Sequence, residues 1–308
     1  MLITGDTRIA VVSSADRQYF PLLYECLDSV KQIWPGDGPC LSLCAVESDL
    51  ELDQKRKLTD IGVCIEPLRD HFSLLKSTKL RGRTYLLTTL VRAFLPDYFP
   101  GHDIYIWIDS DAWACDYSAL ELFILAAARD KLGVVTTTGR FSDKVIQVDR
   151  WWFKWARLRN FMLKNAMRSG LAHKDAHVLA QKPAVNSGIF SLSNTAPHWK
   201  CYQRHSEKIV RKGRIFGTDQ LALGMVMFLD RLPFEILPEW CNWIGAPYYD
   251  RDKQRFVEPY LPHYPIGIMH LAGQDRMRAD AGYTVPVHCL DGSSVDMSLR
   301  YGKGKRGT

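Results

Sequence analysis

Apolar runs alternate with segments of helical periodicity along the first 140 residues of the chain. Runs dominated by apolar residues predict buried strands at residues 8–14, 40–46, 63–65, 104–108 and 133–138. Helical spacing predicts helices at residues 20–34, 53–60, 84–95 and 120–129, with Pro-Gly or Pro ending two of them. This alternation of strands and helices predicts an α/β fold with a mostly parallel sheet and helices on both faces.

The chain changes character after about residue 245. Prolines and tyrosines become frequent there, which predicts irregular packed structure, and residues 302–307 are basic and glycine-rich, as in disordered tails. We find no internal repeat or low-complexity linker before this point. We therefore expect one domain over residues 1–250, followed by a C-terminal segment over residues 251–308.

Composition narrows the classes of protein only moderately. Among 308 residues, 46% are hydrophobic and 24% are charged, as in ordinary globular proteins. The net charge of +6 suits a phosphorylated substrate or an anionic membrane surface, but it is too weak to indicate a nucleic-acid partner. Eight cysteines without a C-x-x-C pair, and an N-terminus without the features of a secretory signal, favour a cytoplasmic protein.

The most informative segment is the strand predicted at residues 104–108, because it ends in Asp109-Ser110-Asp111. A buried strand delivers the residues that follow it to one edge of the sheet, where open α/β folds bind ligands. Two carboxylates one residue apart are hard oxygen ligands that suit Mg²⁺ or Mn²⁺. The alternative is a solvated turn, since Asp and Ser are common turn residues.

Further polar motifs follow other predicted strands or begin helices. Residues 13–19 form a turn between a strand and a helix, where a nucleotide can rest on backbone N–H groups. The alternatives are that Asp16 caps the helix and that Tyr19 packs in the core. The glycine of Asn186-Ser187-Gly188 lets a ligand approach the backbone. Thr218 and Asp219 could cap a helix. His270 could be a core histidine, and Arg92 a surface arginine.

In their order and spacing, six motifs resemble the pattern of the family 8 glycosyltransferases, which are retaining enzymes of the GT-A fold. The matching segments are Ala15-Asp16-Arg17-Gln18-Tyr19, Arg92-Ala93-Phe94-Leu95-Pro96, Asp109-Ser110-Asp111, Asn186-Ser187-Gly188, Asp219-Gln220 and His270-Leu271-Ala272-Gly273. Each motif is weak alone, but six in order are fairly specific, and they extend over most of the chain. The resemblance implies a GT-A, Rossmann-like mixed sheet and transfer of a hexose from a UDP-sugar.

The resemblance also implies a role for each motif. Asp109, Asp111 and His270 would bind Mn²⁺ or Mg²⁺, with the imidazole favouring Mn²⁺, so that the C-terminal segment completes the metal site. Asp219 would bind the donor sugar, and Gln220 would lie near its anomeric carbon. The remaining residues implied to bind the UDP-sugar donor are Ser14, Ala15, Asp16, Tyr19, Arg92, Ser110 and Asn186.

One departure from the family pattern concerns the diphosphate. The family commonly has a K-P-W triplet after H-x-x-G, whereas here Gly273 is followed by Gln274-Asp275-Arg276-Met277-Arg278. Either Arg276 or Arg278 supplies the cation, or the loop has a different arrangement. This departure keeps a catalytically inactive nucleotide-binding module open as an alternative. A D-x-D phosphatase is a more distant one.

The segment 151–162 interleaves tryptophans with basic residues. It is predicted to be a helix packed on the core, or a surface for an acceptor or a membrane. Peripheral membrane contact would involve residues 151–168 or the basic tail. The sequence does not identify the acceptor, which could be a glycan, a lipid-linked oligosaccharide, a protein or a small molecule.

Overall fold

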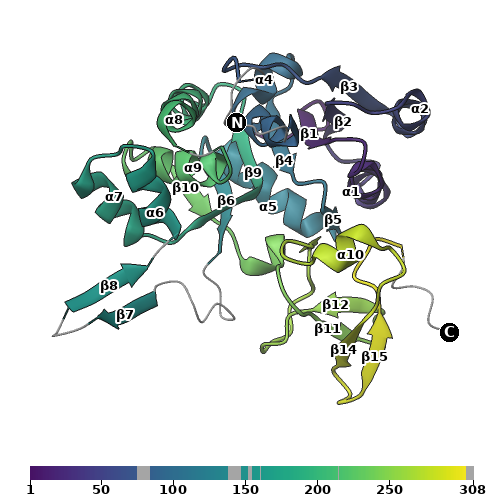
Figure 1. The fold of residues 1–308 in the computed structure, drawn as a ribbon. Coiled ribbons are helices and arrows are strands. Elements are labelled where there is room, and N and C mark those ends of the chain that lie inside the picture. The colour runs from purple at the N-terminus through teal and green to yellow at the C-terminus, as the bar shows by residue number, and fades with distance from the viewer. Residues whose placement is uncertain (75–83, 138–146, 152–154, 160, 214, 303–308) are drawn as a thin grey trace.

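A seven-stranded sheet forms the centre of the protein in the computed structural model (Figure 1). The model describes residues 1–74, 84–137, 147–151, 155–159, 161–213 and 215–302. From one edge to the other, the strands are β10 (Phe234–Ile236), β6 (Leu132–Thr136), β9 (Val185–Ser193), β4 (Ile104–Ile108), β1 (Arg8–Ala15), β2 (Cys40–Glu47) and β3 (Val63–Pro67).

Most neighbouring strands in this sheet are parallel. Strand β9 is the exception, because it is antiparallel to both of its neighbours, β4 and β6. All residues of β4 and β9 are buried, as expected for strands that are covered on both faces. The α/β architecture with a mostly parallel mixed sheet, predicted from the sequence, is confirmed.

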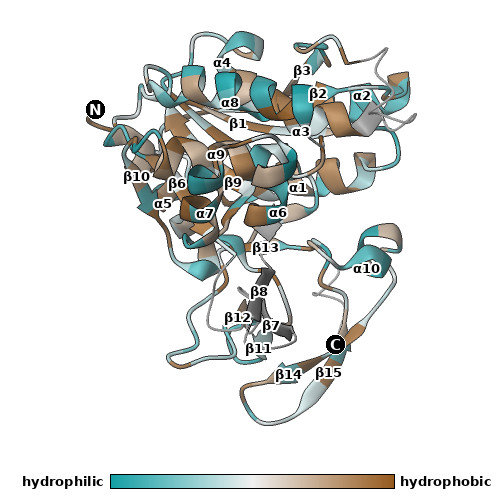
Figure 2. Cartoon of the chain, turned by 60° about the vertical axis from the view of Figure 1, so that its left-hand side comes forward, coloured by the Kyte–Doolittle hydropathy of each residue, from teal (hydrophilic) through white to brown (hydrophobic). Residues whose placement is uncertain are grey.

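Helices cover both faces of the sheet. Alternate residues of β1 contribute to two separate cores, with Ile9 and Val11 in one and Ala10 and Val12 in the other. The first core includes α1 (Phe20–Ile33), α2 (Leu52–Asp60) and α5 (Tyr117–Ala128). The second includes α6 (Phe161–Arg168), α7 (His173–Ala180), α8 (His198–Lys212) and α9 (Thr218–Phe228). Figure 2 shows the apolar strands between these layers.

The helix predicted at residues 84–95 is broken into four short pieces. They are η1 (Thr84–Leu87), α3 (Thr88–Val91), η2 (Arg92–Phe94) and α4 (Leu95–Tyr98). Pro96 lies in the first turn of α4, where its missing N–H costs no helical hydrogen bond. The break places Arg92 in a 3₁₀ turn, and its side chain is buried. The interpretation of Arg92 as a surface arginine is therefore wrong.

The segment predicted as a helix over residues 151–162 is also different. It begins at the end of β7 (Gln147–Trp151), which forms a hairpin with β8 (Trp155–Arg159), and α6 begins only at Phe161. The side chains of residues 147–161 lie outside the described part, so a role of this segment in acceptor or membrane contact stays a prediction.

The C-terminal segment is more regular than the sequence indicated. It forms a second sheet in the order β12 (Arg255–Val257), β11 (Tyr248–Asp250), β14 (Val285–Cys289) and β15 (Ser294–Met297). Figure 1 shows this sheet near the short helix α10 (Asp275–Ala279) and away from the central sheet. The predicted disordered tail lies beyond the described residues. No helix in the described part is both long and apolar enough to cross a membrane.

Candidate functional site

The Asp109-Ser110-Asp111 turn lies at the end of β4, as the sequence predicted. The amide of Ala112 donates to the carbonyl oxygen of Asp109 at 2.9 Å and closes the turn. Strand β5 (Ala112–Ala114) then pairs with β13 (Ile268–His270), and this pairing sets His270 opposite Ala112. Two strands that are distant in sequence thus bring the histidine beside the two aspartates.

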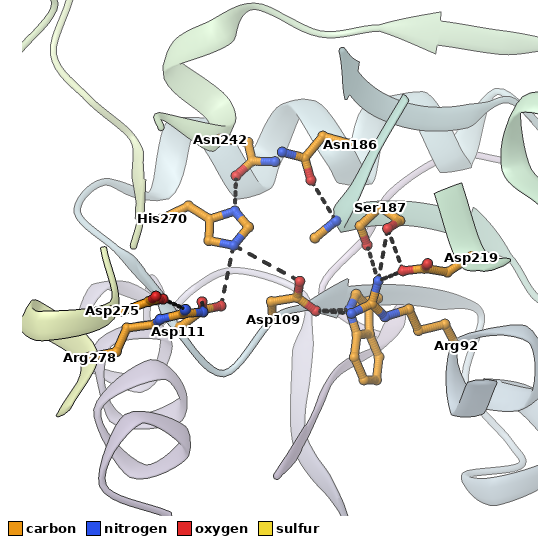
Figure 3. Close-up of polar contacts among 12 residues, drawn as sticks. Arg92, Asp109, Asp111, Asn186, Ser187, Asp219, Asn242, His270, Asp275 and Arg278 are labelled. Carbon is orange, nitrogen blue, oxygen red and sulfur yellow. Dashed lines mark hydrogen bonds and ion pairs between the residues drawn. The ribbon is translucent and has the colours of Figure 1, made fainter. Parts of the chain in front are cut away.

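Asp109, Asp111 and His270 form a group that can hold a metal ion, with one ligand atom from each lying within 4.8 Å of the others. The Nε2 atom of His270 is 3.3 Å from Asp111 Oδ1 and 4.0 Å from Asp109 Oδ2 (Figure 3). On the other side of the ring, Nδ1 is 2.8 Å from the Oδ1 atom of Asn242. An Nδ1–H that donates to this oxygen leaves the Nε2 lone pair free for a metal. Asn242, in η3 (Glu239–Asn242), was not predicted from the sequence.

Gly188 leaves the space that this group requires. A Cβ atom at this position would lie 2.4 Å from His270 Cε1, 3.0 Å from Asn186 Oδ1 and 3.1 Å from Asp109 Oδ2. The pairing of β9 with β6 shifts between Phe190 and Asn186, so Gly188 lies in an irregular part of the strand. Two carboxylates, an imidazole with a free nitrogen and a position without a side chain fit a divalent cation such as Mn²⁺.

Arg92 connects the D-x-D turn to α9. Its guanidinium donates to Asp109 Oδ1 at 2.5 Å and to the Ser187 hydroxyl at 2.8 Å, and it also pairs with Asp219. The Ser187 hydroxyl donates to Asp219 Oδ2 at 2.6 Å. The indole N–H of Trp107 donates to Asp109 Oδ1 at 2.8 Å, and the Arg92 guanidinium lies over the indole ring. Ser187 and Trp107 were not singled out as site residues from the sequence.

The two aspartates differ in their electrostatic surroundings. Burial raises the pKa of Asp109 to about 6, and the neighbouring Arg92 opposes this increase only in part. Burial also acts to raise the pKa of Asp111, but His270 and Arg278 outweigh it and hold that pKa well below its ordinary value. Burial acts to lower the pKa of His270, but Asp111 and Asp109 together outweigh it, so this pKa is raised. Asp111 is thus the more firmly ionised carboxylate.

Asp219 and Gln220 lie in the first turn of α9. Gly217 is the N-cap residue and has φ of +78°, so the proposed capping role for Thr218 or Asp219 is wrong. Asp219 is buried and is held by Arg92 and Ser187. Gln220 is half-buried, and no side-chain hydrogen bond of Gln220 is found within the described residues.

The residues predicted to bind the nucleotide lie around the end of β1. The Ser14 hydroxyl donates to the Val46 carbonyl, so it supports the sheet, and Ala15 is buried at the strand end. Asp16 accepts the amide of Tyr19 at 3.0 Å. Tyr19 is 37% exposed, which excludes the core role, and it borders a cavity of about 400 Å³. Ser110 is half-buried in the D-x-D turn.

The two arginines that follow H-x-x-G differ in position. Arg278, in α10, places Nη1 at 2.9 Å from Asp111 Oδ2, and it also pairs with Asp275 (Figure 3). Arg276 is exposed on the same short helix. Of the two candidates left open by the sequence, Arg278 is the one beside the aspartates.

Comparison with known proteins gives matches in structure only. No family model matches the chain, and no curated protein matches it. The galactosyltransferase LgtC, solved with donor and acceptor sugar analogues, is 13% identical with a TM-score of 0.50 over 85% of this chain and 86% of its own. Mouse xyloside xylosyltransferase 1 is 12% identical with a TM-score of 0.50 over 86% of this chain and 97% of its own.

The bifunctional glycosyltransferase WbbM is also similar, at 16% identity and a TM-score of 0.50, over 79% of this chain and 40% of its own. These likenesses show the fold. The chain has the GT-A glycosyltransferase fold, as the motifs predicted.

Proposed function

We propose that this protein is a metal-dependent, retaining glycosyltransferase that moves a hexose from a UDP-sugar to an acceptor. The observation that carries the proposal is the convergence of Asp109, Asp111 and His270 around Gly188, in a chain with the GT-A fold. Three segments that are far apart in sequence supply ligands of the type that Mn²⁺ or Mg²⁺ takes in proteins. The LgtC structure with donor and acceptor sugar analogues supports the same class of substrate.

In this proposal, Asp109, Asp111 and His270 hold the metal, which would act as a Lewis acid on the diphosphate of the leaving group. Asn242 keeps the His270 ring in place and fixes its tautomer through the 2.8 Å contact. Arg92 pairs with one oxygen of Asp109, so this carboxylate is held in one orientation before a metal binds. The chain thus orients His270 and Asp109 before a metal binds.

The donor sugar would lie between Asn186 and the start of α9. Asp219 contacts Arg92 and Ser187 through Oδ2, so Oδ1 can accept a hydrogen bond from a sugar hydroxyl. Gln220 makes no side-chain hydrogen bond within the described residues, and in this role its amide faces the anomeric carbon. An amide is a poor nucleophile, so we favour front-face attack within an ion pair over a covalent intermediate.

The nucleotide would rest at the end of β1. Here the backbone at Ser14 and Ala15 approaches the phosphates, Asp16 accepts from the base, and Tyr19 stacks on it. The exposed ring of Tyr19 beside a cavity of about 400 Å³ supports this arrangement. Ser110 would contribute from the D-x-D turn. The acceptor, any membrane contact and the cytoplasmic location stay predictions.

Release of UDP from UDP-glucose and UDP-galactose tests the proposal. We expect turnover with Mn²⁺, at least as fast as with Mg²⁺, and none with EDTA. The Asp109→Asn variant should lose this activity, whereas Asp37→Asn, at an exposed position, should keep it. With an acceptor present, the anomeric proton signal should show an α linkage from an α-configured donor.

A catalytically inactive GT-A module is the second candidate, because Arg278 pairs with Asp111 at the metal group. It predicts metal-dependent UDP binding without turnover of any UDP-sugar. The D-x-D phosphatase predicts release of phosphate from a phosphomonoester and no release of UDP. Either result would replace the proposal.

A further inference from the structure

Both aspartates of the candidate metal group already have positively charged partners from the chain. Arg92 pairs with Asp109 at 2.5 Å, and Arg278 pairs with Asp111 at 2.9 Å. A divalent cation needs oxygen atoms of both carboxylates, so it competes with these arginines for negative charge. Arg278 should give up its carboxylate more readily than Arg92, because its side chain is 23% exposed and that of Arg92 is 8% exposed.

The backbone that carries Arg278 is fixed in position. Arg300, buried in the C-terminal segment, pairs with both carboxylate oxygens of Glu25 in α1, each at 2.6 Å. The same guanidinium donates to the carbonyl oxygens of Met277 at 3.3 Å and Arg278 at 3.0 Å, at the end of α10. Because α10 is anchored to α1 in this way, a change of partner by Arg278 requires movement of its side chain alone.

The surroundings of the Arg278 side chain suit an anionic ligand. Its Nε atom is buried and has no hydrogen-bond partner among the described residues. The side chain borders the cavity of about 400 Å³ that Gln18, Tyr19, Asp275 and Arg300 also line. Asp275 pairs with the Nη2 atom of Arg278, so an incoming anion would compete with Asp275 as well as with Asp111. An arginine fork can bind two phosphate oxygens at once, which Arg278 does not do with Asp111, where it uses Nη1.

We propose, building on the function above, that Arg278 exchanges partners: it pairs with Asp111 when the site is empty of nucleotide, and with the diphosphate when the donor is bound. This residue then takes the place of the lysine that the K-P-W triplet would supply. In the first arrangement it weakens metal binding, and in the second it strengthens nucleotide binding. Metal and UDP therefore bind cooperatively, because binding of the diphosphate releases Asp111 for the metal.

The Arg278→Gln variant tests this exchange, because two equilibria should move in opposite directions. Without nucleotide, Mn²⁺ should bind at least about threefold more tightly than in the unchanged protein, since an ion pair with a ligand is lost. With Mn²⁺ present, UDP should bind about tenfold or more weakly, since a charge-assisted contact is lost. Electron paramagnetic resonance of Mn²⁺ measures the first constant, and calorimetry measures the second.

Two controls make the experiment specific. Arg276→Gln removes the same charge from an exposed position on the same helix, and it should change neither constant by more than about twofold. Arg278→Lys keeps the charge but loses the planar fork, and its affinity for UDP should lie between those of the unchanged protein and Arg278→Gln. Thermal unfolding of each variant checks that the fold is kept.

The results separate this inference from the proposed function. If the unchanged protein binds no UDP with any divalent metal, the proposed function fails and the inference fails with it. If it binds UDP but Arg278→Gln moves both constants in the same direction, or moves neither, the exchange is wrong and the proposed function stands. If Arg278→Gln does not fold, Arg278→Lys takes its place. It should bind Mn²⁺ more tightly and UDP more weakly than the unchanged protein, by smaller factors, and the absence of these two changes overturns the exchange.

Discussion

The two aspartates of the candidate site lie one residue apart but belong to regions of different character. In the Arg92 half, made of Arg92, Asp109, Ser187 and Asp219, the pair of Arg92 and Asp219 is deeply buried, with both side chains 8% exposed, while the side chain of Asp109 is 21% exposed. The Arg278 half, made of Asp111, Asn242, His270 and Arg278, reaches a cavity through Arg278.

This difference indicates a division of tasks. Breaking a buried network leaves charges without partners in a medium of low dielectric constant, so the Arg92 half is expected to be rigid. In the other half, Arg278 itself can change partners at a smaller cost, because its side chain is 23% exposed and borders the cavity. The first half would therefore orient the site, and the second would respond to metal and nucleotide.

The largest expected effect comes from the Arg92 half. Arg92→Met leaves the buried Asp219 and the partly buried Asp109 without their cation, and we expect the free energy of unfolding to fall by about 3–5 kcal/mol. Urea unfolding followed by circular dichroism measures the change. As a control, Arg211→Met breaks an exposed pair with Glu207 and should cost less than about 1 kcal/mol. Equal losses in the two variants would contradict the difference between the halves.

Gly188 lies where the two halves meet. In Gly188→Ala the new Cβ would lie 2.4 Å from His270 Cε1, so the ring or the strand must move. We expect a loss of about 1–3 kcal/mol in the free energy of unfolding, together with loss of Mn²⁺ binding. Gly36→Ala is the matched control, because no heavy atom lies within 4 Å of its added Cβ. Unchanged Mn²⁺ binding in Gly188→Ala would remove His270 from the metal group.

Asn242 supports the Arg278 half through His270. Asn242→Ala frees the imidazole to rotate, and we expect the affinity for Mn²⁺ in the presence of UDP to fall by about 10–100-fold. Calorimetry measures this affinity, with Asn194→Ala as the control at an exposed asparagine. A variant that keeps full affinity would show that Asn242 does not orient the ring.

The smallest expected effect is at Gln220, beside the Arg92 half. Gln220→Ala should lower turnover of the UDP-sugar by about tenfold and change the UDP dissociation constant by less than about twofold, since a contact to the reacting carbon acts in the transition state. Steady-state rates and calorimetry give the two numbers. Gln220 is preferred to Asp219 for this test because removing Asp219 also leaves Arg92 without a partner. Equal loss in rate and in UDP affinity would assign Gln220 to the nucleotide.

The alternation of strands and helices could be predicted from the sequence because burial leaves a local pattern. Strand β4 is apolar throughout since both of its faces are covered, and the turn that follows it had to lie at a sheet edge. The same local rules failed at residues 84–95 and 151–162. Apolar spacing there was compatible with a helix, but the structure has short 3₁₀ and helical turns in one case and a hairpin in the other.

The sequence by itself determined the types of side chain available: the carboxylates of Asp109 and Asp111, the imidazole of His270 and a glycine at 188. Only the tertiary structure decided which of them meet. Arg92 and Asp219 are 127 residues apart, and the pairing of β5 with β13 sets His270 beside the aspartates. Asn242 carried no local signal, and the sequence could not choose between Arg276 and Arg278, because these roles depend on where η3 and α10 pack. Periodicity reports whether a residue is buried, whereas its partners depend on strand order and helix packing.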